Sequence, residues 1–325
     1  MNSPAQRAGL AGQLREAFGV RLQQDVPLAP YTSARIGGAA DFLLVVRSSV
    51  ELAATTKVLW EIGIPFRMLG AGSNVLVADA GVRDVVLLNQ ARQVRFSEYE
   101  TEPGVWAESG AGLGVLARRA VERGWSGLEW AVTVPGTLGG AVVGNAGAHG
   151  SDMASCLLMA EILQRNGQAE SWPVERQEYT YRDSWLKRHP GQAVVLSASV
   201  RLSLSTPEET RARAAEFVAQ RQASQPPGAS MGSMFRNPPD DFAGRLIEAA
   251  GLKGLRRGAA EISPLHANFF VNRGGATAAD VWGLVKAARE KVAEQSGIRL
   301  DLEIELLGDW PVEVAEGSPE EGGRA

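Results

Sequence analysis

Apolar residues follow two periods in the first part of the chain. A spacing of three to four residues predicts an amphipathic helix over residues 5–18 and a second helix over residues 50–62, which Ser49 would cap. A continuous apolar run at residues 42–46 is typical of a buried strand. Further strands are predicted at residues 66–69, 75–79 and 84–89. This order of helices and strands indicates a small α/β unit.

Helical and alternating patterns continue through the middle of the chain. A helix is predicted at residues 113–123, and a hairpin around the turn Asn166-Gly167. Strands are predicted at residues 91–100, 104–112 and 193–204. Residues 127–150 form a glycine-rich block between these elements. The middle of the chain therefore indicates an α+β domain that contains glycine loops.

A third unit begins after a polar helix predicted at residues 206–222, where the sequence breaks at Gln225-Pro-Pro-Gly. In this unit a long helix is predicted at residues 278–295, capped by Thr277 and ended by Gly297. The pattern also predicts a helix at residues 241–250 and strands at residues 268–272 and 299–308. The tail, rich in Glu, Gly and Ser, is predicted to be disordered.

Composition and charge narrow the class of protein. With 45% hydrophobic and 22% charged residues, the chain has the composition of an ordinary globular protein. A net charge of -4 gives no electrostatic reason to expect a nucleic acid or an anionic membrane as partner. No apolar stretch reaches the ~18 residues of a membrane span. The single Cys156 excludes a disulfide framework and a cysteine metal cluster, so we expect a cytoplasmic protein without a metal site.

Glycine is unusually frequent, and two clusters suggest contact with a ligand. The loop Gly70-Ala71-Gly72-Ser73-Asn74 follows a predicted strand, so its backbone N–H groups could converge on an anion such as a diphosphate. No Lys-Ser/Thr pair follows, which excludes a Walker A motif. A tight turn without a ligand explains this loop equally well.

The second cluster, residues 135–148, is harder to explain without a ligand. So many small residues in succession lose packing and backbone order, at about 0.5–1 kcal/mol for each Gly relative to Ala. A phosphate or a flat ring lying against bare backbone would compensate, and Thr137 and Asn145 could bond its edges. The alternative is close packing of a helix against a sheet.

Three polar residues are candidates for chemistry, although each has an ordinary structural explanation. Ser233 lies between Gly and Met without a GxSxG elbow, and a hydrolase triad would need His149, His189 or His266 as its base. That pairing stays open on the residues alone. Arg182 follows Tyr181 in a segment that could be an exposed loop. Glu303 belongs to the polar face of an alternating strand, where solvation explains a carboxylate.

Eight separated segments, taken together in this order, resemble the UDP-N-acetylenolpyruvoylglucosamine reductase family over residues 26–308. They are YTSARIGGAADFLL, LGAGSNVLVAD, GLEWAVTVPGTLGGAVVGNAGAHG, YRDS, GSMFRNP, AGRLIEAAGLKG, ISPLHANFFVN and LDLEIELLG. The resemblance implies an α+β fold, with a two-subdomain FAD-binding fold of the vanillyl-alcohol-oxidase type and a C-terminal α+β substrate-binding domain. The domains expected are an N-terminal extension at 1–24, FAD-binding subdomains at 25–92 and 93–205, the substrate domain at 206–312 and a disordered tail at 313–325.

The resemblance also implies a non-covalent FAD and NADPH as co-substrate. NADPH would reduce the flavin, and flavin N5 would pass hydride to the enolpyruvyl group of UDP-N-acetylglucosamine enolpyruvate, giving UDP-N-acetylmuramate for peptidoglycan synthesis. The residues implied to hold FAD are Thr32, Arg35, Gly37, Gly70, Ala71, Gly72, Ser73, Asn74, Pro135, Gly136, Thr137, Gly139, Gly140, Asn145, Gly147 and Ala148.

By the same resemblance, Ser233 donates the proton, while Arg182 and Glu303 stabilise the enol. Arg236, Asn237 and His266 are the implied substrate contacts. A fixed guanidinium beside the developing carboxylate-side charge acts more strongly in the transition state than in the ground state. The expected partners are the sugar nucleotide and NADPH, with no nucleic acid and no membrane, and we expect a monomer.

Some positions depart from the family pattern. Ala34 stands where many members have an aromatic residue, and His149 replaces a common Tyr. The short segment between Asp183 and Val194 leaves no room for an inserted loop, so the chain resembles the compact subtype. Two other functions stay open: an FAD oxidase or dehydrogenase acting on another alcohol or sugar, and a nucleotide-binding regulatory module without turnover.

Overall fold

The computed structural model describes residues 4–97 and 103–311, so the tail predicted to be disordered lies outside the described residues. The chain forms two compact units. The first contains residues up to Leu44, Gly72–Val86 and the chain from Gln222, and the second contains Val45–Ala71 and Leu87–Arg221. The domain bounds expected from the sequence stay predictions.

Helix α1 (Pro4–Phe18) precedes the strands of a small four-stranded sheet. Strand β1 (Gln23–Pro27) pairs antiparallel with β2 (Ala39–Val46), with Val26 opposite Ala40. The strands of this four-stranded sheet have the order β1-β2-β5-β3, where β5 is Val82–Asn89 and β3 is Phe66–Leu69. Buried Asp41 of β2 accepts from Arg83 Nη1 at 2.6 Å, so its charge is paired inside an otherwise apolar strand.

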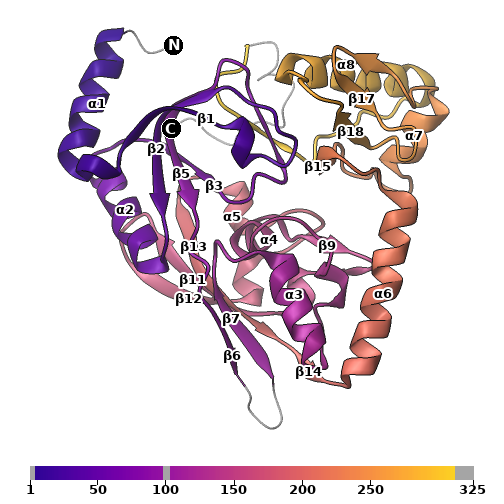
Figure 1. Cartoon of the computed structure of the whole chain (residues 1–325), viewed down its shortest axis with the longest axis horizontal. Helices are drawn as coiled ribbons and strands as arrows, with labels where there is room; N and C mark the ends of the chain where they lie inside the picture. Colours follow the sequence, from indigo (N-terminus) through magenta and orange to yellow (C-terminus); the bar gives the residue numbers. More distant parts are fainter. Residues whose placement is uncertain (1–3, 98–102, 312–325) are drawn as a thin grey trace. The chain divides into compact units, whose positions relative to one another are not determined.

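Another sheet and two helices lie entirely within the first unit. Strands β15 (Ala229–Ser233), β18 (Phe269–Asn272), β17 (Ala260–Ile262) and β16 (Arg256–Arg257) are hydrogen-bonded in that order. Helices α7 (Ala243–Ala249) and α8 (Ala278–Ser296) contact each other, and α8 lies along β17 (Figure 1). Their buried faces share one apolar cluster, which includes Phe235, Phe270 and Val285.

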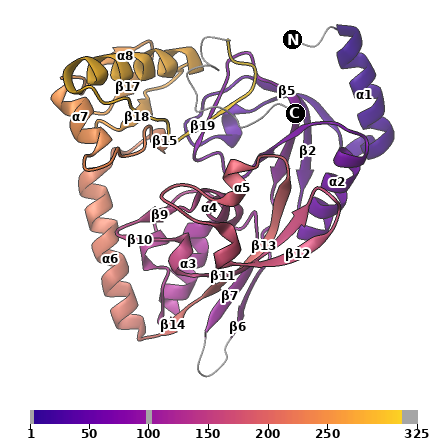
Figure 2. The same ribbon diagram turned by 180° about the vertical axis from the view of Figure 1, so that it is seen from behind.

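The second unit is built on a five-stranded antiparallel sheet of order β12-β11-β13-β7-β6 (Figure 2). Its strands are β12 (Ala169–Pro173), β11 (Leu157–Gln164), β13 (Ala193–Arg201), β7 (Gly104–Glu108) and β6 (Val94–Ser97). Helices α2 (Ser49–Glu61) and α4 (Leu138–Gly144) both contact the central strand β13. The remaining elements are α3 (Leu113–Glu122), α5 (Trp185–Arg188), α6 (Pro207–Ser224), β8 (Trp125–Ser126), β9 (Gly147–Ala148), β10 (Ser151–Asp152) and β14 (Ser203–Leu204).

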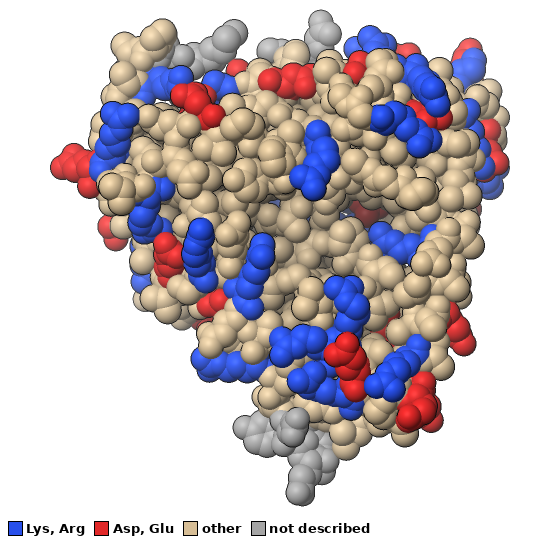
Figure 3. Space-filling model, viewed as in Figure 1, with Lys and Arg blue, Asp and Glu red and all other residues tan. Residues whose placement is uncertain are grey.

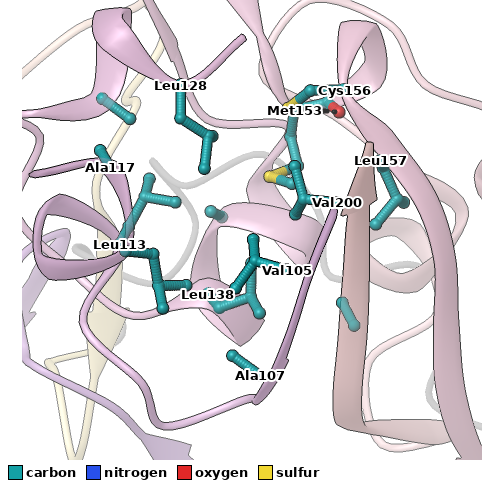
Figure 4. Close-up of a cluster of buried hydrophobic side chains, with 14 of the residues drawn as sticks. Val105, Ala107, Leu113, Ala117, Leu128, Leu138, Met153, Cys156, Leu157 and Val200 are labelled. Atoms are coloured by element: carbon teal, nitrogen blue, oxygen red, sulfur yellow. Dashed lines mark hydrogen bonds between the residues drawn. The ribbon is translucent and has the colours of Figure 1, made fainter. Parts of the chain in front are cut away.

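Apolar side chains from helices and strands close the core of this unit. Leu138 of α4 and Leu113 of α3 lie in one buried cluster with Val105 of β7 and Val200 of β13 (Figure 4). Burying such side chains contributes about 1.5–3 kcal/mol each, which fixes the short helix α4 to the sheet. The glycine-rich block is therefore held in place by its few large residues.

Most predicted elements are confirmed. The helix at 278–295 has the predicted cap, since Thr277 accepts from Asp280 N, and it ends at Gly297 in a left-handed conformation. The hairpin around Asn166-Gly167 is formed by β11 and β12. One cap was predicted wrongly by one residue: α2 is capped by Ser48, whose hydroxyl accepts from Glu51 N at 3.1 Å.

The predicted last strand, residues 299–308, is wrong in extent. Only Glu305–Leu307 forms strand β19, parallel to β4 (Val75–Val77). Residues before it bond to a different partner, because Leu302 forms an isolated bridge with Phe235. A change of partner interrupts one ladder although the apolar alternation continues, with Leu300, Leu302 and Ile304 buried.

The charged surface and the helices of the structure bear on the expected partners. Basic and acidic side chains are interspersed on the face shown in Figure 3. Within the described residues, no helix is both long enough and apolar enough to cross a membrane.

Candidate active site

Arg182 contacts the glycine-rich block. Its Nη2 donates to the carbonyl of Gly147 at 2.6 Å, and its Nη1 lies 3.4 Å from the carbonyl of Asn145. A Cβ added to Gly147 would lie 3.1 Å from Nη1, so a larger residue there would crowd the guanidinium. The backbone of Arg182 has a φ of 58°, a conformation that L-residues avoid unless the surrounding structure imposes it. The structure thus joins a predicted catalytic residue to a predicted cofactor segment.

Two residues that the sequence did not single out anchor the segment around Arg182. The Tyr179 hydroxyl donates to the carbonyl of Val142 at 2.8 Å. The Ser184 hydroxyl donates to the carbonyl of Val143 at 2.6 Å and also accepts from Lys187 N. Arg182 is therefore fixed on both sides to α4. All six residues of the segment YTYRDS are polar, so the sequence does not identify which of them bond to α4.

Asn145 orders the glycine-rich block through its side chain. Its Nδ2 donates to Asp152 Oδ2 at 3.1 Å and to the carbonyl of Thr180 at 3.0 Å, and its Oδ1 accepts from Ala154 N. Both amide hydrogens are thereby used within the protein. The residue is buried and has a φ of 42°. Its predicted contact with a cofactor stays a prediction, and this geometry leaves that contact to the backbone.

The two predicted cofactor loops meet at Gly70 and Thr137. A Cβ added to Gly70 would lie 2.7 Å from Thr137 Oγ1. Thr137 caps α4, since its hydroxyl accepts from Gly140 N at 3.3 Å. A Cβ on Gly139 would lie 2.8 Å from Ser109 Cβ. Close packing, the alternative explanation for the glycines, is therefore present at Gly70 and Gly139.

In the first unit, residues 32–37 form a turn that packs on Gly72. Ser33 N donates to the carbonyl of Gly72 at 2.9 Å, and a Cβ on Gly72 would collide with the backbone of Tyr31 and Thr32. The Thr32 hydroxyl is hydrogen-bonded to the Ile36 carbonyl at 3.0 Å. Arg35 is exposed, with Nη1 donating to the carbonyl of Pro30. A Cβ on Gly37 would meet Val77.

Ser233 and Glu303 lie on neighbouring backbone segments of the first unit. Glu303 N donates to the carbonyl of Met234, the residue after Ser233, at 2.9 Å. Ser233 ends β15 opposite Phe269, after a register shift in which Gly232 adopts a φ of 81°. Such bulges redirect side chains at the end of a strand. Two of the three predicted catalytic residues are thus brought together, while Arg182 belongs to the second unit.

The predicted substrate contacts present hydrogen-bond donors. Asn237 Oδ1 accepts from Ala243 N at 3.1 Å, so its amide nitrogen is the group left to donate. His266 Nδ1 accepts from Asn268 N at 3.2 Å, which places the proton of the neutral ring on Nε2. Arg236 Nε is buried without a hydrogen-bond partner among the described residues. Such a donor set suits an anionic ligand.

The histidines do not support a serine triad. His149 stacks on Phe217 with 4.3 Å between ring centroids, and His189 stacks on Trp185. His266 uses Nδ1 for the Asn268 backbone. No hydrogen bond joins Ser233 to a histidine within residues 4–97 and 103–311.

The small residues of the two glycine segments fit a flavin dinucleotide. They combine backbone donors with hydroxyl side chains and no acidic group, a set that suits a diphosphate. Larger residues at Gly70 or Gly139 would push these segments apart. Residues 40–171 match the family described as "FAD binding domain". The chain is an FAD-dependent oxidoreductase, and its predicted α+β, flavin-binding fold is confirmed.

The chain belongs to the UDP-N-acetylenolpyruvoylglucosamine reductase family. Residues 222–307 match that family's C-terminal domain. The reductase of Chloroflexus aggregans is 41% identical over 90% of this chain and 100% of its own length, and that of Rubrobacter xylanophilus is 46% identical over 88% and 95%. The solved structure of the Thermus caldophilus reductase has a TM-score of 0.75 and 36% identity, covering 88% of this chain and 99% of that one.

Proposed function

We propose that this protein reduces UDP-N-acetylglucosamine enolpyruvate to UDP-N-acetylmuramate with NADPH, as a step of peptidoglycan precursor synthesis. The hydrogen bond from Glu303 N to the carbonyl of Met234 carries the proposal. It joins the segment of Glu303, which is predicted to stabilise the enol, to the segment of Ser233, which is predicted to donate the proton. Family membership supports the substrate. We further propose that the enzyme works as a cytoplasmic monomer.

FAD, when bound, would supply the hydride chemistry that links NADPH to the enolpyruvyl carbon. The residues that would hold it are Thr32, Arg35 and Gly37, the loop 70–74, and Pro135, Gly136, Thr137, Gly139, Gly140, Asn145, Gly147 and Ala148. Several of these side chains, and the N–H groups of Gly139 and Gly140, already bond within the protein, so other backbone N–H groups of these segments would supply part of the binding.

Arg182 orients and stabilises the carboxylate side of the substrate. Addition of hydride to an enolpyruvyl group builds negative charge there, and a guanidinium fixed beforehand stabilises that charge without reorganising. The bond to the Gly147 carbonyl and the anchors at Tyr179 and Ser184 support this fixed placement. A guanidinium is planar and carries five N–H donors, a geometry that matches a carboxylate better than an ammonium group does.

Ser233 delivers the proton that completes the reduction. Its hydroxyl has no hydrogen bond to another described residue, so its proton is not held by the protein itself. A hydroxyl is a weak acid in water, but a positioned one can transfer a proton to an adjacent carbanionic centre. Half-buried Glu303 assists if it shares a proton with the enol oxygen, because an unshared negative charge would oppose the reaction. Arg236, Asn237 and His266 bind the anionic nucleotide part.

The visible spectrum of the purified protein tests the proposal. A flavin absorption band should be bleached by NADPH under anaerobic conditions and restored by the enolpyruvyl sugar nucleotide. Restoration by oxygen or another sugar, with no response to this substrate, would instead indicate an oxidase or dehydrogenase of different specificity. A flavin band that NADPH does not bleach would indicate a binding module without turnover.

A further inference from the structure

Asn268 makes a two-sided hydrogen bond with the backbone of Phe235. Its Oδ1 accepts from Phe235 N at 2.9 Å, and its Nδ2 donates to the Phe235 carbonyl at 2.8 Å. The residue is 3% exposed, so both bonds are shielded from water. Its own carbonyl also accepts from Met234 N at 2.8 Å. One residue therefore bonds three successive peptide groups after Ser233, through Met234 N, Phe235 N and the Phe235 carbonyl.

This clamp acts where the regular ladder between β15 and β18 ends. Ser233 is the last residue of β15, paired with Phe269, and the register has already shifted between Ser230 and Ser233. Beyond Ser233 the chain leaves the strand, and an irregular backbone needs partners for its buried polar groups. The amide of Asn268 has the donor and acceptor of a peptide group, so it continues the ladder by one step.

The segment held by Asn268, residues 234–236, is also hydrogen-bonded to the backbone around Glu303. The carbonyl of Met234 accepts from Glu303 N at 2.9 Å, and Phe235 bridges Leu302. Arg236 N donates to the carbonyl of Asp301 at 2.9 Å. A shift of residues 234–236 would therefore move Ser233, which precedes them in the chain, and Glu303, which is hydrogen-bonded to Met234. Asn268 is the buried side chain whose bonds resist that shift.

We propose that Asn268 is a positioning residue for proton delivery, holding Ser233 and Glu303 in register through the backbone of Phe235. The inference rests on the proposed function, because it concerns the step in which Ser233 protonates the reduced substrate. Leucine has the same branched arrangement of side-chain heavy atoms as asparagine, although it is larger, and it lacks donor and acceptor, so two buried backbone groups would lose their partners. An ionised aspartate at position 268 would still accept the bond from Phe235 N. Its second oxygen, however, would face the Phe235 carbonyl oxygen, and two acceptors cannot form a hydrogen bond.

The test measures the two half-reactions separately in the FAD-loaded enzyme. In Asn268→Leu, re-oxidation of the reduced flavin by the enolpyruvyl sugar nucleotide should slow by about 10- to 100-fold, the loss that a small misplacement of catalytic groups causes. Asn268→Asp should show a smaller loss. Flavin reduction by NADPH should keep the wild-type rate in both variants. The solvent deuterium isotope effect on re-oxidation should rise, because proton transfer becomes slower than hydride transfer.

Thr210→Val is the matched control. The buried Thr210 hydroxyl donates to the carbonyl of Val121 at 2.8 Å, so this variant also loses a buried side-chain to backbone bond without losing volume. It should lower the melting temperature and leave both half-reactions and the isotope effect unchanged.

Three outcomes would overturn the inference. One is a wild-type re-oxidation rate and isotope effect in Asn268→Asp, which also decides the matter if Asn268→Leu does not fold. Another is an equal fall of both half-reactions in Asn268→Asp. The third is a loss in Thr210→Val as selective as that in the Asn268 variants. If the wild-type enzyme itself is not re-oxidised by the sugar nucleotide, the proposed function fails first.

Discussion

The Asn74 side chain holds the backbone of Glu303. Asn74 Nδ2 donates to the Glu303 carbonyl at 3.1 Å, and the Asn74 carbonyl accepts from Glu305 N at 2.9 Å. Residues 229 positions apart are thereby joined, and the loop predicted to bind the cofactor contacts the segment predicted to bear the acid. Cofactor loop and acid therefore depend on each other's placement within the first unit.

Asn74→Ala should destabilise the protein by about 1 kcal/mol, the net value of one hydrogen bond. Urea unfolding would measure this as a lower midpoint with an unchanged slope. Flavin re-oxidation by the sugar nucleotide should also slow, because Glu303 loses its support. Asn166→Ala is the control, because the Asn166 side chain accepts a local bond from Gln168 N in an exposed hairpin. Equal kinetic losses in both variants would argue against coupling between Asn74 and Glu303.

Ser233→Ala should separate the two half-reactions. Loss of the proton donor should slow flavin re-oxidation by the sugar nucleotide about 100- to 10,000-fold, the usual contribution of general acid catalysis. Reduction of the flavin by NADPH needs no proton from Ser233 and should stay near the wild-type rate. Rapid mixing under anaerobic conditions measures both steps. A parallel fall of the two rates would assign Ser233 to binding instead of proton transfer.

Arg182→Lys should fail although it keeps the positive charge. An ammonium group cannot reproduce the planar guanidinium that bonds the Gly147 carbonyl and matches the geometry of a carboxylate, so turnover should drop about 100-fold or more. Arg188→Lys provides a control on the same segment. Arg188 forms exposed ion pairs with Asp183 and Glu178, which contribute little. Comparable activity in the two variants would contradict the role of Arg182.

His266 should make the protein less stable in mild acid. Burial lowers the pKa of His266, and the positive charge of Lys253 lowers it further, outweighing Glu248. In the unfolded chain the imidazole titrates near its ordinary pKa of about 6.5. As the pH falls, the unfolded state therefore binds the proton first. The contribution of His266 to the free energy of unfolding is complete above about pH 6.5 and decreases as the pH falls from there towards the lower pKa of the folded state.

Urea unfolding of the wild type and of His266→Asn between pH 5 and 8 measures this dependence. The difference in unfolding free energy between the two proteins should grow smaller as the pH falls below about 6.5. A nuclear magnetic resonance titration gives the pKa of His266 directly. A value above the ordinary one would reverse the sign and contradict the prediction.

The sequence predicted correctly those elements whose start and end are set by residues within the element or next to it. Thr277, Asp280 and Gly297 sit at the two ends of α8, and each acts on backbone groups within a turn of itself. The turn Asn166-Gly167 likewise sets its hairpin locally. The last strand was overestimated because alternation records which residues are buried and not which strand they pair with.

Motif resemblance pointed to the family and implied roles for the candidate residues, but it did not show which hydrogen bonds these residues make within the protein. The predicted contact of Asn145 with FAD stays a prediction, and the structure adds that its side-chain amide bonds Asp152, Thr180 and Ala154. Asn268 belongs to the segment ISPLHANFFVN, and the resemblance implied no role for it. An amide side chain bonds equally well to ligand or backbone, so only its surroundings decide between them.

By itself, the sequence determined the local elements, the glycine segments and the family, because caps, turns, periodicity and ordered motifs are properties of neighbouring residues. The tertiary structure alone decided that Gly70 meets Thr137, that Arg182 lies on Gly147, and that Asn74 and Asn268 hold the backbone around Glu303 and Ser233. These contacts join residues far apart in the chain, and their partners are mostly backbone carbonyls and amides. Every residue carries those groups, so no side-chain pattern could have marked them in advance.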